Sequence, residues 1–375
     1  MQNVRVIELH DERLGVEAFL VIDHDLFPVA AGGTRMLPDV ELQEVARLAR
    51  AMTWKFAANR LPYAGAKAGV RFAGGDRAAV LAAYKRALEP YSDVFLTGPD
   101  MGTSAADFLE GSEESLPLWA QDHQGLGMDD LATGHGVKAA AEAALTHLGR
   151  ALEDAAVAIE GFGKVGAGTA RACARAGARI VGVSTVDGLL ADSDGLDVED
   201  IISLRARYGD RFVEHGPKPA RDREDIFDLD CDVLVPGARP DSITCNIAGR
   251  IHCAVVAPGA NIPYGRGAVE VLYQRGILAV PDFVSNSGGI HLYETVRPDT
   301  EPEAALAEIE GLVGKAVLGV VAIAEELKVT PLAAAFQQAR DYLVETTGAS
   351  RDLVDTLFRA GDAFPNLGRA LSVQA

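Results

Sequence analysis

Two lysines stand in an unusually apolar part of the sequence. Lys55 lies in a run of helix-forming residues, and Lys67 follows twelve positions later in what reads as a turn rich in glycine and alanine. The stretch from 51 to 70 contains no acidic residue, although the whole chain carries a formal charge of −19. A buried ammonium group needs a partner of opposite charge. These lysines therefore either decorate a surface or meet an anion that a bound molecule supplies.

A second group of residues with chemical meaning is a glycine pattern. Gly161, Gly163 and Gly166 form the arrangement G-x-G-x-x-G between an apolar strand and an alanine-rich helix. In that context the glycines allow a tight turn, and the helix N-terminus offers free N–H groups to a pyrophosphate. The alternative is a glycine turn that only packs a helix on a sheet. The predicted dinucleotide-binding residues of this turn are Gly161, Phe162, Gly163, Lys164, Val165 and Gly166.

The end of the next strand distinguishes NAD from NADP. A carboxylate there usually binds the ribose of NAD, and residues 184–187 read STVD, with the acid two positions after Thr185. No Lys or Arg occurs from 180 to 204 to meet a 2′-phosphate. We therefore expect NAD rather than NADP, with contacts from Ser184, Thr185 and Asp187.

The hydrophobic pattern predicts an α/β protein of two domains separated by a cleft. In the first part, the predicted strands are Val4–Leu9, Val16–Ile22, Gly69–Phe72 and Val94–Thr97, and the predicted helices are 41–58 and Asp76–Glu89. From 155 onward, short apolar strands alternate with crossovers, which predicts a Rossmann-type parallel sheet covered on both faces. These strands are Ala155–Glu160, Arg179–Ser184, Val233–Val235, Ala254–Ala257 and Ile277–Val280, and residues 302–360 read as helical.

Each of the two predicted domains is assigned a range of residues and a role. Residues 1–130, completed by C-terminal helices in 338–375, would bind substrate and form the oligomer. Residues 131–337 would bind the dinucleotide.

Composition excludes several functions. Hydrophobic residues make up 48% and charged residues 24%, as in globular proteins. The negative charge argues against nucleic acid and anionic membranes. The four cysteines form no C-x-x-C pair, so we expect neither a metal site nor a disulfide framework. No apolar stretch is long enough for a membrane span and residues 1–15 do not resemble a signal peptide, so a cytoplasmic protein is expected.

Five longer motifs now make the chain similar to a known family. They are AAGGTRM (30–36), TGPDMGTSAADF (97–108), ATGHGV (132–137), APGANIP (257–263) and VPDFVSNSGG (280–289). With the two lysines they resemble the Glu/Leu/Phe/Val dehydrogenases, in family order over nearly the whole chain. The resemblance implies oxidation of an amino acid to a 2-oxo acid and ammonia, with hydride passed to a nicotinamide, and the reverse reaction. It also implies a homo-oligomer.

The resemblance assigns roles around the substrate. Lys55 would pair with the substrate α-carboxylate, which is the missing anion. Gly32 and Gly33 would let the backbone approach the substrate. Lys67 would polarise the reacting carbon and activate water, with a pKa lowered toward neutrality, and Asp100 would be the general acid/base. The alternatives are a surface lysine at 55, a solvated turn lysine at 67 and a helix N-cap at 100.

Further roles follow from the same resemblance. Thr133 and Asn286 would position the nicotinamide, and Asn261 would contact the α-carboxylate or the cofactor. The side-chain pocket would be lined by Ala106, Ile290 and Tyr293.

The preferred substrate is expected to be apolar. Glutamate enzymes carry a lysine shortly before the double glycine, whereas residues 28–31 read PVAA here. Burying a second substrate carboxylate without a cation is costly, so we expect a branched-chain or aromatic amino acid. Three alternatives stay open: a glutamate dehydrogenase that uses Arg35 or Arg60 as the cation, a dinucleotide-binding sensor without turnover, and an enzyme that forms a Schiff base at Lys67.

Overall fold

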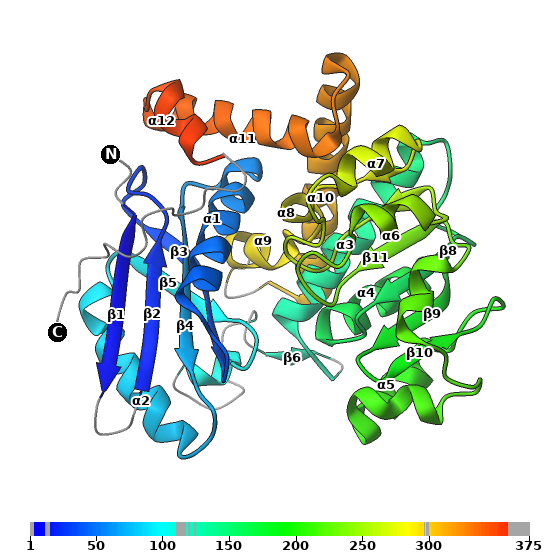
Figure 1. Cartoon of the computed structure of the whole chain (residues 1–375), viewed down its shortest axis with the longest axis horizontal. Coiled ribbons are helices and arrows are strands. Elements are labelled where there is room, and N and C mark those ends of the chain that lie inside the picture. The colour runs from blue at the N-terminus through cyan, green and yellow to red at the C-terminus, as the bar shows by residue number, and fades with distance from the viewer. Residues whose placement is uncertain are drawn as a thin grey trace. The chain divides into compact units, whose positions relative to one another are not determined.

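The computed structural model describes residues 4–11, 16–109, 118, 121–123, 125–295, 297 and 300–358. The chain divides into two compact units, residues 1–116 with 336–375 and residues 117–335. Each unit contains its own β-sheet flanked by helices (Figure 1). The predicted α/β class with a Rossmann-type sheet is confirmed, while the functional boundaries at 130 and 337 stay a prediction.

The first unit contains a five-stranded sheet in the order β1-β2-β4-β3-β5. Strand β3 runs parallel to both β4 and β5, and the other neighbours are antiparallel. The predicted bounds of β2 are confirmed, but β3 was missed. The strands are β1 (Arg5–Asp11), β2 (Val16–Ile22), β3 (Ala30–Leu37), β4 (Ala64–Arg71) and β5 (Phe95–Pro99).

The two faces of this sheet carry different layers. Helix α2 (Arg77–Leu88) covers one face, where Tyr84 packs in the core with the alanines of β4. Helix α1 (Leu42–Ala58) covers the other face. Because strand residues alternate between faces, Lys67 points to the α1 side. Lys67 therefore lies within a strand and not in the predicted turn.

Glycines in β4 allow α1 to lie directly on the sheet. A Cβ at Gly65 would stand 2.2 Å from the Thr53 amide nitrogen, and one at Gly69 would stand 2.4 Å from the Val40 side chain. This close approach brings the helix segment that carries Lys55 next to the strand that carries Lys67.

Helix α11 (Pro331–Thr347), from residue 336 onward, and helix α12 (Arg351–Thr356) supply the C-terminal part of the first unit. Arg50 donates from Nε to both carboxylate oxygens of Asp23, at 2.8 and 2.7 Å. Its Nη1 donates to the carbonyls of Thr356 and Leu357, at 3.3 and 3.2 Å. The Trp54 indole also donates to the Leu357 carbonyl, at 2.7 Å. We call these five residues the C-terminal clasp.

The second unit contains a six-stranded sheet in the order β10-β9-β8-β11-β12-β13. All pairs are parallel except β9 with β10, a hairpin partner that the sequence did not predict. The strand order reverses between β8 and β11, where dinucleotides bind in such sheets. The strands are β8 (Ala156–Glu160), β9 (Arg179–Thr185), β10 (Gly188–Ala191), β11 (Val233–Pro236), β12 (Val255–Val256) and β13 (Leu278–Ala279).

Helices cover both faces of this sheet. On one face, α6 (Cys245–Arg250) and α7 (Ala268–Gln274) pack on alternate strand residues such as Ala158. On the other, α3 (Met128–His147) and α4 (Lys164–Arg175) pack so closely that a Cβ at Gly134 would stand 2.6 Å from Gly168. The remaining helices are α5 (Val198–Tyr208), α8 (Asp282–Ser285), α9 (Gly288–Thr295) and α10 (Pro302–Leu327).

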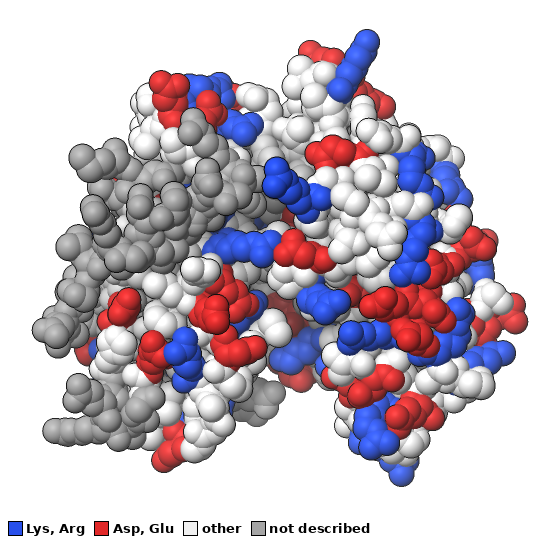
Figure 2. Space-filling model, viewed as in Figure 1, with Lys and Arg blue, Asp and Glu red and all other residues white. Residues whose placement is uncertain are grey.

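Within the described residues, no helix combines the length and the apolar character that a membrane span requires. On the face shown in Figure 2, Lys and Arg side chains are intermingled with Asp and Glu side chains.

Candidate active site

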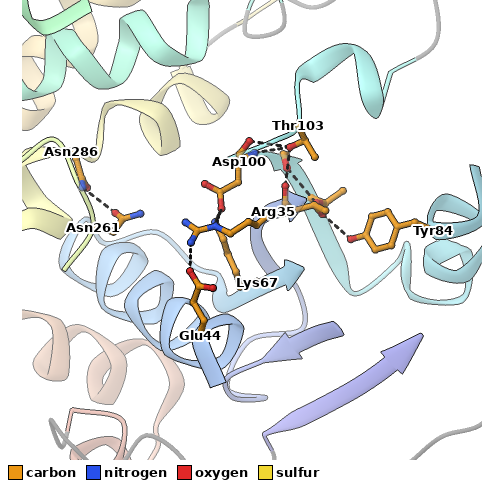
Figure 3. A network of polar contacts seen from close by, with 11 residues as sticks. Arg35, Glu44, Lys67, Tyr84, Asp100, Thr103, Asn261 and Asn286 are labelled. Atoms are coloured by element: carbon orange, nitrogen blue, oxygen red, sulfur yellow. Dashed lines mark hydrogen bonds and ion pairs between the residues drawn. The ribbon is translucent and has the colours of Figure 1, made fainter. Parts of the chain in front are cut away.

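Three charged side chains meet at one end of the first sheet. The Nζ of Lys67 lies 2.9 Å from Oδ2 of Asp100, and the Nε of Arg35 donates to the same oxygen at 3.0 Å (Figure 3). Lys67 comes from β4, Arg35 from β3, and Asp100 follows β5. Because β3 lies between β4 and β5, the three residues are neighbours although they are far apart in sequence.

The charged groups of this network are shielded from solvent. The side chains of Lys67, Arg35 and Asp100 are only 5%, 9% and 18% exposed. Burial alone would raise the pKa of Asp100, but the charges and hydrogen bonds of Lys67 and Arg35 outweigh it and hold that pKa well below its usual range. Asp100 is therefore ionised and can accept hydrogen bonds, and it is a weaker base than a solvated carboxylate.

The double glycine makes room for this network. A Cβ at Gly33 would stand 3.2 Å from Lys67 Nζ and 3.1 Å from Asp100 Cβ. A Cβ at Gly32 would stand 1.7 Å from the Ala66 carbonyl oxygen, which no side chain can tolerate. The glycines are thus required for strand packing, and their contact with substrate stays a prediction.

Asp100 does not cap a helix, so that alternative is wrong. Its backbone amide donates to Thr103 Oγ1 at 2.9 Å, and the same hydroxyl donates to the Thr34 carbonyl at 2.8 Å. The nearby 3₁₀ turn, Ala105–Asp107, has Ser104 at its N-cap. Thr103 therefore anchors the backbone of Asp100, a role that the sequence did not indicate.

The other predicted substrate contacts of this unit are placed as follows. Lys55 is 8% exposed in α1 and Lys67 is 4% exposed, so neither is a solvated surface lysine. Ala31 pairs with Gly65 in β4 and so faces α1, as Lys67 and Arg35 do. Ala106 lies exposed in the 3₁₀ turn.

In the second unit, the glycine turn that was predicted to bind a dinucleotide requires glycine at two positions. Gly161 has a φ of 88°, and a Cβ there would stand 2.6 Å from the Ala238 amide nitrogen. A Cβ at Gly166 would stand 2.3 Å from the Gly161 carbonyl oxygen. Gly163 is the N-cap of α4, and a Cβ there would meet nothing within 4 Å. A Cβ at the N-terminus of α4 would thus point into open space, and the binding of a pyrophosphate there stays a prediction.

The end of β9 is tied to this turn. The amides of Phe162 and Gly161 donate to the Ser184 carbonyl at 2.8 and 3.2 Å. Thr185 Oγ1 donates to the Asp210 carbonyl at 2.9 Å, and Asp187 is exposed at the tip of the β9–β10 hairpin. The 3₁₀ segment η5 (Gly209–His215) therefore lies beside the strand end.

This arrangement brings an arginine of η5 near the end of β9, although the two are far apart in the sequence. Arg211 follows Asp210 directly. It lies outside residues 180–204, the stretch without Lys or Arg on which the prediction of NAD was based. Its Nη2 and Nε donate to Glu214 Oε2 at 2.8 and 3.2 Å. The one arginine of η5 is therefore already paired with a carboxylate of the same segment.

The two predicted asparagines lie together. Asn286 Nδ2 donates to Asn261 Oδ1 at 3.0 Å and to the Ala260 carbonyl at 3.0 Å (Figure 3). Ile262, which follows Asn261 in the chain, has a φ of 54°, and its amide donates to Asp282 Oδ2 at 2.8 Å. A β-branched residue in this left-handed region is strained.

The other predicted cofactor and pocket residues lie around α3 and α9. Thr133 Oγ1 donates to the Asp129 carbonyl at 2.9 Å. Lys164 Nζ lies 3.5 Å from Asp130 Oδ2, and burial together with the charge of Asp129 raises the pKa of Asp130 to about 6. In α9, Ile290 is half-buried and Tyr293 is exposed, and a Cβ at Gly289 would stand 2.9 Å from Thr133 Oγ1.

Comparison with known proteins covers both units. Residues 125–340 match the Glutamate/Leucine/Phenylalanine/Valine dehydrogenase model, and residues 4–110 match the Glu/Leu/Phe/Val dehydrogenase dimerisation domain. The chain is 32% identical over 288 residues to glutamate dehydrogenase A2 of Halobacterium salinarum, a match that spans 69% of this chain and 66% of that protein.

A second relative and a solved structure agree with this assignment. The chain is 34% identical over 292 residues to glutamate dehydrogenase of Thermotoga maritima, which spans 70% of this chain and 67% of that protein. The crystal structure of the hetero-hexameric glutamate dehydrogenase of Thermus thermophilus, in a leucine-bound form, has a TM-score of 0.77 and 25% identity and covers 94% of this chain and 89% of its own.

Proposed function

Because the chain belongs to the Glu/Leu/Phe/Val dehydrogenase family, we propose that it is an amino acid dehydrogenase. It converts an L-amino acid to the 2-oxo acid and ammonia with a nicotinamide dinucleotide, and it catalyses the reverse reductive amination. One observation carries this proposal: a buried ammonium and a carboxylate, Lys67 and Asp100, lie 2.9 Å apart beside Gly33, where a Cβ would stand 3.2 Å from Lys67 Nζ.

The site residues match the steps of this reaction. Asp100 accepts a proton from the substrate amine or from water. Lys67 donates a hydrogen bond to the oxygen or nitrogen on the reacting carbon and stabilises negative charge there. Lys55 pairs with the α-carboxylate. When bound, the dinucleotide supplies the hydride acceptor, and the turn at 161–166 holds its pyrophosphate.

These roles predict separable kinetic effects. Lys67→Ala and Asp100→Asn should each reduce kcat by about 100-fold or more, while NADH still binds. Lys55→Ala should mainly raise the KM for the amino acid. Near-normal turnover by Asp100→Asn would contradict its proton role. Tight NADH binding by wild-type protein with no turnover of any amino acid would instead support a dinucleotide-binding sensor.

The preferred substrate is proposed to be a branched-chain or aromatic amino acid. Ala31 contributes only a methyl group to the face of the sheet that carries Lys67. Arg35, one candidate cation for a second carboxylate, is already engaged by Asp100 and Glu44. Arg60, the other candidate, is 60% exposed and pairs with Glu345 at 3.8 Å. A glutamate side chain would therefore bury its charge at this face without a cation from these residues.

Glutamate is the second candidate, and the comparisons favour it, because the curated relatives quoted above are glutamate dehydrogenases. The two readings are separated by NADH formation with glutamate, leucine, valine and phenylalanine. We expect higher kcat/KM with an apolar substrate, and Ala31→Lys should shift the ratio toward glutamate by about 10-fold or more. Wild-type preference for glutamate would refute the apolar proposal.

NAD is the proposed cofactor and a homo-oligomer the proposed assembly. Asp187 at the hairpin tip and the pairing of Arg211 with Glu214 both disfavour a 2′-phosphate. The match of residues 4–110 to a dimerisation domain supports self-association through the first unit. Titration with NADH and NADPH, and light scattering, test the two statements.

A further inference from the structure

We propose that Arg35 is a positioning residue for Asp100: it shares with Lys67 the grip on Oδ2 and so leaves Oδ1 as the oxygen that exchanges a proton with the substrate. The inference rests on the proposed dehydrogenase function for its chemical meaning. Its geometry can be examined independently.

Both cations hold one oxygen of the carboxylate. Arg35 Nε donates to Asp100 Oδ2 at 3.0 Å, and Lys67 Nζ reaches the same atom at 2.9 Å. Figure 3 shows both contacts on this one carboxylate oxygen and no contact drawn to Oδ1 among the residues shown. A carboxylate has acceptor capacity on both oxygens, so the unused capacity of Asp100 is concentrated on Oδ1. That oxygen is available to a bound molecule.

Arg35 is itself fixed from two sides. Its Nη1 pairs with Glu44 on α1, while its Nε holds Asp100 beyond the end of β5. The guanidinium is planar, so engaging two edges fixes its plane and thereby the plane of the carboxylate. A lysine at position 35 would retain the charge but not this planar, two-sided grip.

The charged and polar groups that face Asp100 come from every neighbouring element. They are Lys67 from β4, Arg35 from β3, Glu44 on α1 acting through Arg35, and Thr103 at the Asp100 backbone. Removing Arg35 removes one of the two cations in direct contact and leaves Lys67 as the other.

The proton step follows from this arrangement. In the oxidative direction the N–H bond of the substrate ammonium breaks, its electron pair stays on nitrogen, and a new O–H bond forms at Oδ1. Asp100 becomes neutral and the amine becomes neutral, so charge is conserved. In the reverse direction the same Oδ1–H bond returns the proton. Arg35 takes no part in bond making and acts only through Asp100.

The test compares two substitutions of Arg35 with a control in the same sheet. Arg35→Met removes charge and grip, and Arg35→Lys keeps the charge only. Arg71→Met is the control, because Arg71 also links strand and loop, through the Val40 carbonyl at 2.9 Å and Glu17, at a site without contact to Asp100. Each variant is measured for kcat and kcat/KM against pH, NADH affinity and melting temperature.

The expected pattern is specific to positioning. Losing a cation raises the pKa of Asp100, so kcat/KM of Arg35→Met should begin to fall at a higher pH than in the wild type, where that pKa lies well below its usual range. Arg35→Lys should keep the wild-type pH dependence but lose about 10-fold in kcat. Arg71→Met should change neither. If Arg35→Lys retains full kcat, or if folded Arg35→Met keeps the wild-type pH dependence, the proposal is refuted.

A crystal structure of the variants gives a readout that does not depend on turnover. In Arg35→Lys and Arg35→Met the carboxylate of Asp100 should rotate, so that Oδ1 and Oδ2 no longer divide between substrate side and Lys67. An unrotated carboxylate in both variants would overturn the inference even if no amino acid were oxidised. Absence of turnover in wild-type protein with a rotated carboxylate in the variants would instead refute the dehydrogenase function alone.

Discussion

Removal of Arg50 should destabilise the first unit far more than removal of a comparable surface arginine. Asp23 is fully buried. Its carboxylate oxygens accept two hydrogen bonds from Arg50 Nε and one from Thr53 Oγ1 at 2.6 Å. Arg50→Met leaves this carboxylate without its cation, which costs about 3–5 kcal/mol for a buried pair. The carbonyls of Thr356 and Leu357 also lose their donor from Nη1.

Trp54 makes the effect directly measurable. Its indole donates to the Leu357 carbonyl and lies 5.0 Å from the Phe336 ring, centroid to centroid. The chain has one other tryptophan, Trp119, so a Trp119→Phe background isolates the Trp54 emission. Denaturant unfolding followed by this emission should show a free energy of unfolding lowered by about 3–5 kcal/mol in Arg50→Met.

Arg340 provides the matched control. It also lies at the junction of α11 and α12, pairs with Asp355 at 3.2 Å and lies 5.0 Å from the Phe358 ring centroid, but its side chain is 25% exposed. Arg340→Met should cost only about 0.2–1 kcal/mol. Equal losses in the two variants would refute the reasoning. Because the clasp sits on α1, Arg50→Met should also raise the KM for the amino acid through Lys55.

Three further predictions concern the second unit. Gly161→Ala should lower stability and abolish NADH binding, since its φ of 88° and the 2.6 Å approach to Ala238 exclude a Cβ, whereas Gly163→Ala should fold normally in calorimetry and lose only NADH affinity. Ile262→Gly should raise the melting temperature by relieving a strained φ of 54°, and an unchanged or lower value would argue against strain there. Asp130→Asn should stabilise the unit at about pH 8 and not at about pH 4, because a carboxyl with a raised pKa of about 6 favours folding below its unfolded pKa and loses that contribution as pH rises through about 6.

The strands that the sequence predicted well are those with continuous apolar runs. β2 consists largely of Val, Phe, Leu and Ile, and β9 contains Ile180, Val181 and Val183 close together, so their pattern is visible without tertiary information. β3 and β4 contain glycine and alanine at positions where strands usually carry larger apolar side chains. Those small residues are required by α1 and by the neighbouring strands, as Gly65 shows, and such a requirement cannot be seen in a single strand.

The candidate active site likewise contains features that the sequence predicted and features that only the structure revealed. Resemblance to a family singled out Lys67 and Asp100, and the structure brings them into contact. The contact of Arg35 with Asp100 depends on β3 lying between β4 and β5, an order that the one-dimensional pattern does not contain. The position of Arg211 beside β9 depends likewise on a hydrogen bond from Thr185 to a residue 25 positions away.

The first unit is interrupted in sequence, and this has a consequence for synthesis on the ribosome. Residues 1–116 emerge before 117–335, and 336–375, which complete the unit, emerge after them. At about 5–20 residues per second, the first segment waits about 10–40 s for its missing part. During that interval Asp23, Arg50 and the Trp54 ring lack the carbonyls and aromatic rings that later cover them. The groups that the C-terminal helices cover are therefore exposed longest in the nascent first segment, while the second unit, continuous in sequence, is complete before residue 336 is made.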